Sequence, residues 1–313
     1  MVASPVAQAS AGRAAGLESR GCRRKAPGRT RRTSRLTPRR RESRQRRKHV
    51  TPQLEELDRR RPSSATCGAL PPLGQVLLTN SSVFLFGYPA LRSGLSNLAI
   101  AHSWMLGTLV LAGFQAGGYV LVCAYFVFGT LVTKVGKKVK VEEGTFERNE
   151  GKRTPASVWG SGFAAAVCAV LALAFAGDEA VCRLLRVGFV ASLATKLSDT
   201  VASEIGKACG RTTILITSLK PVPRGTDGAV SLEGTLAGLL ASAAYAGLSW
   251  KLGQVNPLGA CVCVIAAFLA TGLESWIGAT LQQESSILTN DVVNGLMISA
   301  GSLIAMATMK ALT

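Results

Sequence analysis

Charged and hydroxyl-bearing side chains are concentrated in one stretch of this 313-residue chain, directly after an apolar run. On a helix, Lys196, Asp199, Ser203 and Lys207 fall at positions i, i+3, i+7 and i+11 and form one stripe, with Glu204 at its edge. Carboxylates bind magnesium, and lysines neutralise the phosphate oxygens that a metal does not reach. The stripe therefore predicts a site for a phosphate group held through a hard cation, with ion pairing inside the helix as the alternative.

A second polar block, between Lys220 and Glu233, combines prolines and glycines with Arg224, Thr226 and Asp227. Prolines stiffen a chain, and glycines allow backbone N–H groups to approach an anion closely, so the block predicts a phosphate-binding loop. It is not a Walker A loop, because the chain has no G-x-x-x-x-G-K-[ST] string. Glu233 falls in the first turns of the next predicted helix, where it serves either as a ligand or as a partner of the helix dipole.

Further polar residues border the apolar segments. Lys152 and Arg153 precede one segment, where paired cations can bind phosphate oxygens. Asp291 and Asn294 lie at i and i+3 where the last segment begins, so they can share one cation, or Asp291 can simply complement the helix dipole. Glu274 ends the preceding segment, and acidic side chains in such places are costly unless they have a function.

These candidates lie between apolar segments whose length suits a lipid bilayer, since about 20 apolar residues cross it as a helix. Period-two alternation is absent, so the sequence predicts an all-α, polytopic transmembrane helical bundle with seven or eight spans and a bilayer as its surroundings. Faces rich in Gly, Ala and Ser allow neighbouring helices to approach closely. The apolar segments are 74–91, 94–113, 115–133, 157–177, 181–197, 229–250, 256–273 and 291–310.

Most of the positive charge lies in an N-terminal leader. Residues 1–61 hold 19 Lys and Arg residues against five acids, so they carry +14 of the formal net charge of +18. The leader is rich in Arg, Ser, Ala and Pro and lacks the apolar core of a secretory signal. Residues 1–65 are therefore predicted to be a disordered organelle transit peptide, followed by a multi-pass transmembrane domain at 66–313. A basic tail that binds nucleic acid is the alternative for the leader, while the remaining charge indicates no nucleic-acid partner for the domain.

Cysteine and histidine positions exclude several kinds of site. The eight cysteines are scattered without metal-ligand spacing, and the two histidines, His49 and His102, are isolated. The sequence therefore argues against a zinc site, a histidine-based triad and a haem site. The cysteines are expected to be small buried residues in a reducing compartment.

Four motifs in a fixed order resemble those of the plant phytyl-phosphate kinases of vitamin E synthesis, a family of multi-pass membrane proteins. The resemblance covers roughly residues 70–313, and the leader resembles a plastid transit peptide. The motifs are Thr-Lys-Leu-Ser-Asp-Thr-Val-Ala-Ser-Glu-Ile-Gly-Lys at 195–207, Pro-Arg-Gly-Thr-Asp-Gly-Ala-Val-Ser-Leu-Glu-Gly-Thr-Leu-Ala-Gly at 223–238, Glu-Ser-Trp-Ile-Gly-Ala at 274–279 and Asn-Asp-Val-Val-Asn at 290–294.

This resemblance implies transfer of a phosphoryl group from CTP or another nucleoside triphosphate to phytyl phosphate, giving phytyl diphosphate for tocopherol and phylloquinone synthesis. It implies the chloroplast envelope as the location, with its inner membrane as the expected one. Under this hypothesis Mg²⁺ on the nucleotide is held by Asp199, Glu204 and Asp227, with Asp291 and Asn294 as further candidates. The transferring phosphoryl oxygens are stabilised by Lys196, Lys207, Lys220 and Arg224. The expected substrate contacts are completed by Lys152, Arg153, Ser203, Thr226 and Glu233.

One departure from the family concerns the string Gly151-Lys-Arg-Thr-Pro155, where relatives have Gly-Arg-Arg-Gly-Pro. A lysine keeps the charge but loses the bidentate fork of arginine, which puts a phosphate-binding role for Lys152 in doubt.

Other functions remain open from the residues alone. A kinase that acts on phytol or another free prenyl alcohol needs the same donor site. An ion or phosphometabolite transporter of the envelope also places carboxylates beside helices rich in glycine, and a structural envelope protein needs no chemistry at all. The sequence leaves the nucleotide preference and the oligomeric state undetermined.

Overall fold

The structure is a computed structural model that describes residues 71–146, 152–282 and 287–313. The predicted transit peptide at 1–65 lies outside the described residues, so its boundary with the transmembrane domain stays a prediction.

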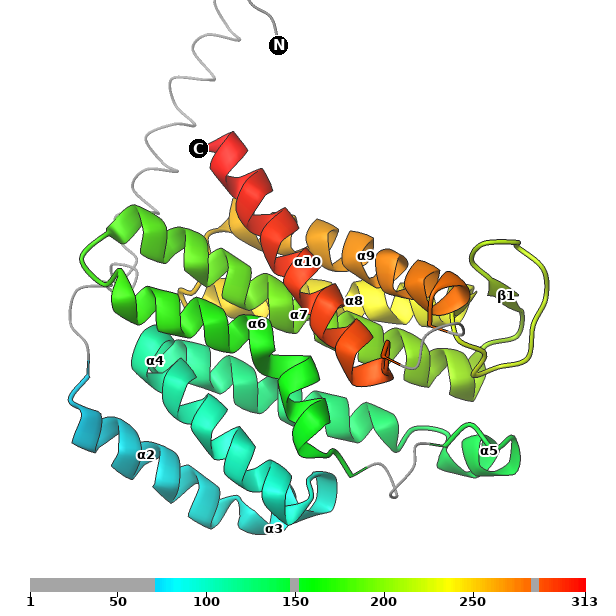
Figure 1. The fold of residues 1–313 in the computed structure, drawn as a ribbon, viewed down its shortest axis with the longest axis horizontal. Coiled ribbons are helices and arrows are strands. Elements are labelled where there is room, and N and C mark those ends of the chain that lie inside the picture. The colour runs from blue at the N-terminus through cyan, green and yellow to red at the C-terminus, as the bar shows by residue number, and fades with distance from the viewer. Residues whose placement is uncertain (1–70, 147–151, 283–286) are drawn as a thin grey trace, which may run out of the picture. The chain divides into compact units, whose positions relative to one another are not determined.

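The described chain is helical apart from one small hairpin, which confirms the predicted all-α class (Figure 1). Two short antiparallel strands, β1 (Thr213–Leu215) and β2 (Ala229–Ser231), form the hairpin, which the sequence had predicted only as a loop. The helices are α2 (Leu73–Phe86), α3 (Tyr88–Gly94), α4 (Asn97–Thr133), α5 (Lys137–Glu142), α6 (Pro155–Ala174), α7 (Glu179–Cys209), α8 (Leu232–Lys251), α9 (Pro257–Thr280) and α10 (Asn290–Leu312).

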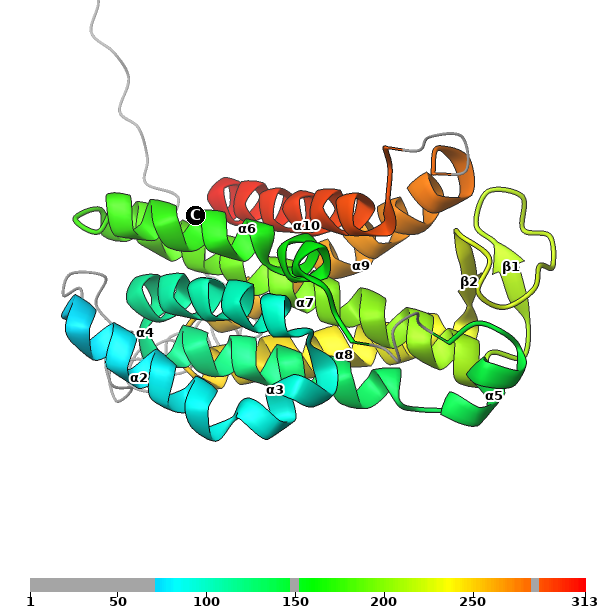
Figure 2. The ribbon, with the colours of Figure 1, turned by 60° about the horizontal axis from the view of Figure 1, so that its bottom comes forward.

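Four of the described helices, α4, α6, α9 and α10, are long and apolar enough to cross a membrane. Helix α4 is interrupted at Gln115, whose backbone has φ 57° and ψ −163°, and the chain reverses its direction there (Figures 1 and 2). The two segments predicted at 94–113 and 115–133 are thus the two halves of α4. The remaining predicted segments correspond to α2 with α3, to α7 and to α8.

Helix α7 lies among the others and packs against α4, α6, α8, α9 and α10 (Figure 1). Its N-terminal half contributes to the hydrophobic core, where Phe189 stacks on Phe114 of α4 with ring centroids 4.4 Å apart. Its C-terminal half carries the polar stripe. Because α7 contacts all these helices, the packing fixes its rotation and therefore the direction in which the polar stripe faces.

Glycines set the distance between α7 and α8. A Cβ atom on Gly238 would lie 2.7 Å from the carbonyl oxygen of Ser198, and one on Gly234 would collide with the carbonyl oxygen of Ala202. Any larger residue at these positions would push α8 away from the polar half of α7. The small-residue motif therefore has the packing role that the sequence predicted.

The hairpin loop is pressed against the C-terminal end of α9. Gly228 has a φ of +75°, and a Cβ atom there would lie 2.5 Å from both the Ser275 carbonyl oxygen and the Ala279 backbone nitrogen. Only glycine combines this conformation with so close an approach. This contact fixes the loop that carries Asp227 beside α9.

Candidate active site

A polar cavity of about 640 Å³ lies between α6, α7, α9, α10 and the hairpin loop. It gathers most of the site residues predicted from sequence, although they come from four separate segments. Those that line it are Lys152, Arg153, Lys196, Asp199, Ser203, Lys207, Arg224, Thr226, Asp227, Asp291 and Asn294. The three predicted residues outside the lining are Glu204, Lys220 and Glu233.

Lys196 joins α7 to α10 at the cavity wall. Its ammonium donates to Asp199 Oδ2 over 2.7 Å and to Asn294 Oδ1 over 2.8 Å. The lysine is 8% exposed, so these contacts compensate for the cost of burying its charge. An ammonium group has three N–H donors, so Lys196 can hold both neighbours and still donate to a ligand oxygen.

Carboxylates from four elements border the cavity: Asp199 on α7, Asp227 on the hairpin loop, Glu274 on α9 and Asp291 on α10. Glu274 lines the same cavity as Lys196, Asp199 and Asp227. Glu274 stood out in the sequence as an acid at the end of an apolar segment, but no role followed from that signal. Its position makes it a fourth acidic group of the site.

These carboxylates fit a magnesium ion that arrives with a nucleotide. Within the described residues, no three Asp, Glu, His or Cys side chains lie close enough together to hold a metal by themselves. Mg²⁺ typically binds through one or two carboxylates while phosphates and waters complete its shell. Asp199 pairs with Lys196, and Asp227 follows Arg224 in the hairpin loop, so these two acids could hold such an ion with a cation nearby in the structure or the sequence.

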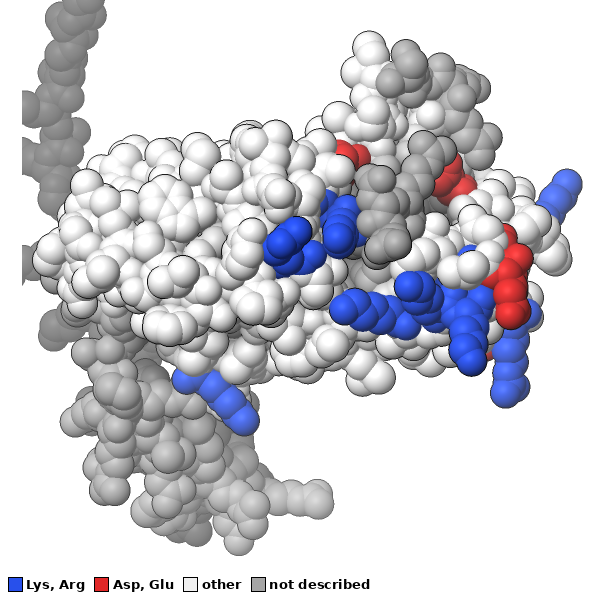
Figure 3. Space-filling model, turned by 90° about the horizontal axis from the view of Figure 1, so that it is seen from below, with Lys and Arg blue, Asp and Glu red and all other residues white. Residues whose placement is uncertain are grey.

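Basic side chains form the other part of the lining. Arg224 pairs with Glu143 of the α5 end, with Nη1 3.1 Å from Oε1, and Arg153 Nη1 donates to the Tyr125 hydroxyl over 3.0 Å. Figure 3 shows that most charged side chains on one face of the molecule lie toward one end, while the other end is largely uncharged. A charged end beside an apolar body is the arrangement expected of a site at a membrane surface.

Glu204 has a different environment from the rest of the stripe. It is 2% exposed and forms a buried ion pair with Lys140 of α5, which is itself fully buried and donates to the Thr133 carbonyl oxygen over 2.6 Å. Lys207 approaches the second Glu204 oxygen to 3.5 Å. These contacts tie α5 to α7, and the predicted role of Glu204 as a metal ligand stays a prediction.

The two other predicted residues also lie outside the cavity lining. Glu233 accepts a hydrogen bond from the backbone N–H of Arg211 over 3.3 Å, which links the start of α8 to the chain that leaves α7. Lys220 is exposed on the hairpin loop. Their predicted contacts with substrate stay predictions.

Hydroxyl groups on α6 line the cavity and were not singled out from the sequence. Thr154 caps α6 by accepting from the Ser157 backbone N–H over 3.3 Å, and Ser157 and Ser161 follow on one face of the helix. Their spacing of four residues is the signal that could have indicated a polar face directed at the same ligand.

The chain belongs to a family of integral membrane proteins, DUF92, whose family model matches residues 80–302. This range includes every candidate site residue. The chain is 48% identical over 239 residues to Protein VTE6, chloroplastic, from Arabidopsis thaliana, with 76% of this chain and 72% of that protein covered.

Two prokaryotic relatives extend the comparison. The chain is 48% identical over 237 residues to the uncharacterized membrane protein sll0875 of Synechocystis, with 76% of this chain and 91% of that protein covered. It is 29% identical over 213 residues to the uncharacterized membrane protein MJ0933 of Methanocaldococcus jannaschii, with 67% and 84% covered. No solved structure matches the chain. The protein is thus a multi-pass membrane protein similar to VTE6.

Proposed function

We propose that this protein is an isoprenoid monophosphate kinase that transfers a phosphoryl group from CTP, or another nucleoside triphosphate, to phytyl phosphate. The product is phytyl diphosphate, for tocopherol and phylloquinone synthesis in the chloroplast envelope. The four motifs and the similarity to a chloroplastic relative support the assignment. The cavity supports its chemistry, because both substrates are polyanions and the lining supplies cations and carboxylates together.

The observation that carries the proposal is the unit formed by Lys196, Asp199 and Asn294. It places a buried ammonium and a carboxylate side by side in the lining of a cavity that holds further acidic and basic side chains. An ion pair with a purely structural role does not need to line a cavity. A donor site for a nucleotide needs both charges, because the metal and the unmetallated phosphate oxygens are held by groups of opposite sign.

The reaction would need little covalent chemistry from the protein. An oxygen of phytyl phosphate attacks the γ-phosphorus of the nucleotide, and the bond from that phosphorus to the β–γ bridging oxygen breaks, releasing CDP. The attacking oxygen is already ionised at neutral pH, so no strong general base is required. Bound Mg²⁺, held by Asp199 and Asp227, would withdraw charge from the nucleotide phosphates.

The side chains around the cavity would align the two substrates and stabilise charge. Lys196 and Lys207 lie on the same stripe as Asp199 and would contact the oxygens of the transferring phosphoryl group. Arg224 would neutralise the nucleotide from the hairpin loop. Arg153 is well placed for the acceptor phosphate, because it lies on the side of the cavity that adjoins α4 and α6.

The test is to supply membranes that contain the full chain with CTP labelled at the γ-phosphate, together with either phytyl phosphate or phytol, and to separate the lipid products. We expect labelled phytyl diphosphate from phytyl phosphate and no product in membranes without the protein. Product from phytol alone would change the acceptor to a free alcohol. No product from either acceptor, with uptake of labelled nucleotide or phosphate into sealed vesicles, would make the protein a transporter.

A further inference from the structure

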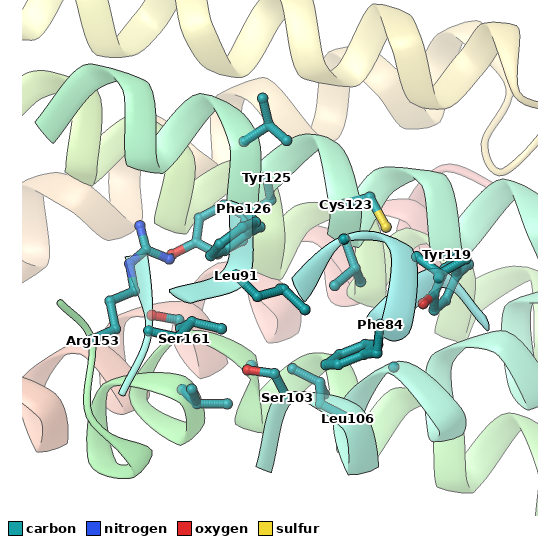
Figure 4. Close-up of a pocket in the computed structure, with 18 of the residues that line it drawn as sticks. Phe84, Leu91, Ser103, Leu106, Tyr119, Cys123, Tyr125, Phe126, Arg153 and Ser161 are labelled. Carbon is teal, nitrogen blue, oxygen red and sulfur yellow. The ribbon is translucent and has the colours of Figure 1, made fainter. Parts of the chain in front are cut away.

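A second, apolar pocket of about 230 Å³ adjoins the polar cavity. It is lined by residues of α2, α3, both halves of α4, α6 and α7, and its walls are mainly aliphatic and aromatic (Figure 4). Arg153 and Ser161 line both the pocket and the cavity, so the two spaces meet at these residues. An apolar space that opens next to a cation is shaped for an amphiphile with an anionic head group.

Arg153 is fixed at this junction by its backbone. Its N–H donates to the Gly94 carbonyl oxygen over 2.9 Å, and its own carbonyl oxygen accepts from the Ser96 N–H over 3.0 Å. A Cβ atom on Gly129 would lie 2.6 Å from Nη2, so glycine there makes room for the guanidinium. With five N–H donors, the guanidinium can bind the Tyr125 hydroxyl and a phosphate at the same time.

Tyr119 and Cys123 lie at the end of the pocket opposite Arg153 (Figure 4). The Tyr119 hydroxyl donates to Asn80 Oδ1 over 2.7 Å. Asn80 is fully buried and donates from Nδ2 to the Trp104 carbonyl oxygen and to Thr108 Oγ1, each over 2.9 Å. Because these buried polar groups satisfy one another, they hold the tyrosine ring as a rigid end wall.

We propose that this pocket binds the hydrocarbon chain of the isoprenoid monophosphate acceptor, with its phosphate at Arg153 and Ser161, and that the end wall at Tyr119 and Cys123 selects the chain length. This inference rests on the proposed function and adds the substrate's tail site to it. Tyr119, Val122, Cys123 and Phe126 follow one face of α4, which advances roughly 10 Å over these residues. Because an extended phytyl chain is longer than this advance, the chain would lie folded in the pocket between Arg153 and Tyr119.

The shape of the pocket, and not the hydrophobic free energy of binding, would determine which isoprenoid phosphates react. Lipid tails are as apolar as the pocket lining, so moving an isoprenoid chain from the bilayer into the pocket gains little hydrophobic free energy. A chain that fits between the end wall and Arg153 instead holds its phosphate at a fixed depth beside the nucleotide, and such alignment raises the rate of transfer. A chain of the wrong length would misplace the phosphate.

The first experiment compares kcat/KM for geranyl, farnesyl and phytyl phosphates in membranes that contain the full chain. Cys123→Phe fills the end of the pocket, and we expect it to lower the ratio of phytyl to geranyl phosphate turnover by roughly tenfold or more. The matched control is Val120→Phe on the same helix, which is 45% exposed and outside the pocket lining, and should leave the ratio unchanged. The ratio does not depend on how much enzyme folds.

A second experiment needs no turnover. A phytyl phosphate analogue with a diazirine at the far end of its chain is bound to the wild-type protein, activated by light, and the modified peptide is identified. We expect labelling of the α2 and α4 residues around Phe84, Tyr119 and Cys123, and loss of that label when unlabelled phytyl phosphate competes. Labelling of other helices, or an unchanged turnover ratio in Cys123→Phe, would overturn the proposal.

The two experiments separate this inference from the kinase assignment. If phytyl diphosphate forms but the label lies elsewhere, the tail site is wrong and the kinase stands. If the label lies at the end wall but wild-type membranes form no diphosphate, the lipid phosphate binds as proposed and the reaction is wrong.

Discussion

Two lysine–carboxylate pairs share the polar half of α7 and differ in what surrounds them. Lys196 and Asp199 face the cavity, and the lysine also binds Asn294. Lys140 and Glu204 are buried away from the cavity lining. Each pair joins an ammonium to a carboxylate, so ionic chemistry alone does not identify a site. Only the first pair lines a cavity, which supports its proposed role in the reaction, while the contacts of the second pair hold α5 on α7.

The same substitution in both pairs tests whether they have different roles. Lys196→Met removes an ammonium that would contact the phosphoryl oxygens. We expect kcat/KM for phytyl phosphate to fall by roughly a hundredfold to a thousandfold, the size seen when one stabilising donor is removed from an active site. The amount of protein in the membrane, measured by immunoblot, should stay similar. Activity within threefold of the wild type would contradict the role of this pair.

Lys140→Met should act on stability instead. It leaves Glu204 buried with only the distant contact to Lys207, and breaking a buried pair in this way costs about 3 kcal/mol of the free energy of unfolding. Denaturant titration in mild detergent measures this loss.

The double variant Lys140→Met/Glu204→Met sharpens the assignment of Glu204. Replacing a whole buried pair by apolar side chains is often neutral, so we expect its stability to return toward that of the wild type and its activity to return as well. A stable but inactive double variant would show that Glu204 takes part in the chemistry.

Arg153→Lys tests the cation at the acceptor side with a smaller change. The charge remains but the planar fork is lost, so we expect the KM for phytyl phosphate to rise roughly tenfold, as for the loss of one charged hydrogen bond. The KM for CTP should stay the same. Equal increases in both values would place Arg153 at the nucleotide instead.

The smallest effect is expected at the partly exposed pair of Arg224 and Glu143. Pairs of this kind contribute less than about 1 kcal/mol, so Glu143→Gln should change the free energy of unfolding by less than that amount and kcat/KM by no more than about fivefold. A large loss of activity would mean that Glu143 positions Arg224 for the nucleotide.

Periodicity predicted the stripe on α7 well, because helical spacing alone places Lys196, Asp199, Ser203 and Lys207 on one face, and all four line the cavity. Glu204 shows the limit of the method. It lies at the edge of the stripe, and only the tertiary structure reveals that Lys140, 64 positions earlier, covers that edge. Periodicity describes one helix and carries no information about its neighbours.

The parts of the fold that follow from the length of apolar segments could be predicted from the sequence. The parts that depend on single contacts were harder to predict. The segments on both sides of Gln115 were predicted as separate spans, although glutamine is not a turn residue and gave no sign of its positive φ. The hairpin strands are three residues each, too short for an alternating pattern to be recognised. The hydrogen bond between Arg153 and Tyr125 joins residues 28 positions apart, and no local sequence pattern indicates it.

The central claim is that phosphoryl transfer takes place in the polar cavity. Its most direct test compares two Asp→Asn variants on α7. Asp199 faces the cavity, whereas Asp178 caps the opposite end of the helix by accepting from the N–H groups of Ala180 and Val181, a role that asparagine can also fill. With γ-labelled CTP and phytyl phosphate, Asp178→Asn should form phytyl diphosphate at the wild-type rate and Asp199→Asn should form none. Full activity in Asp199→Asn would contradict the account.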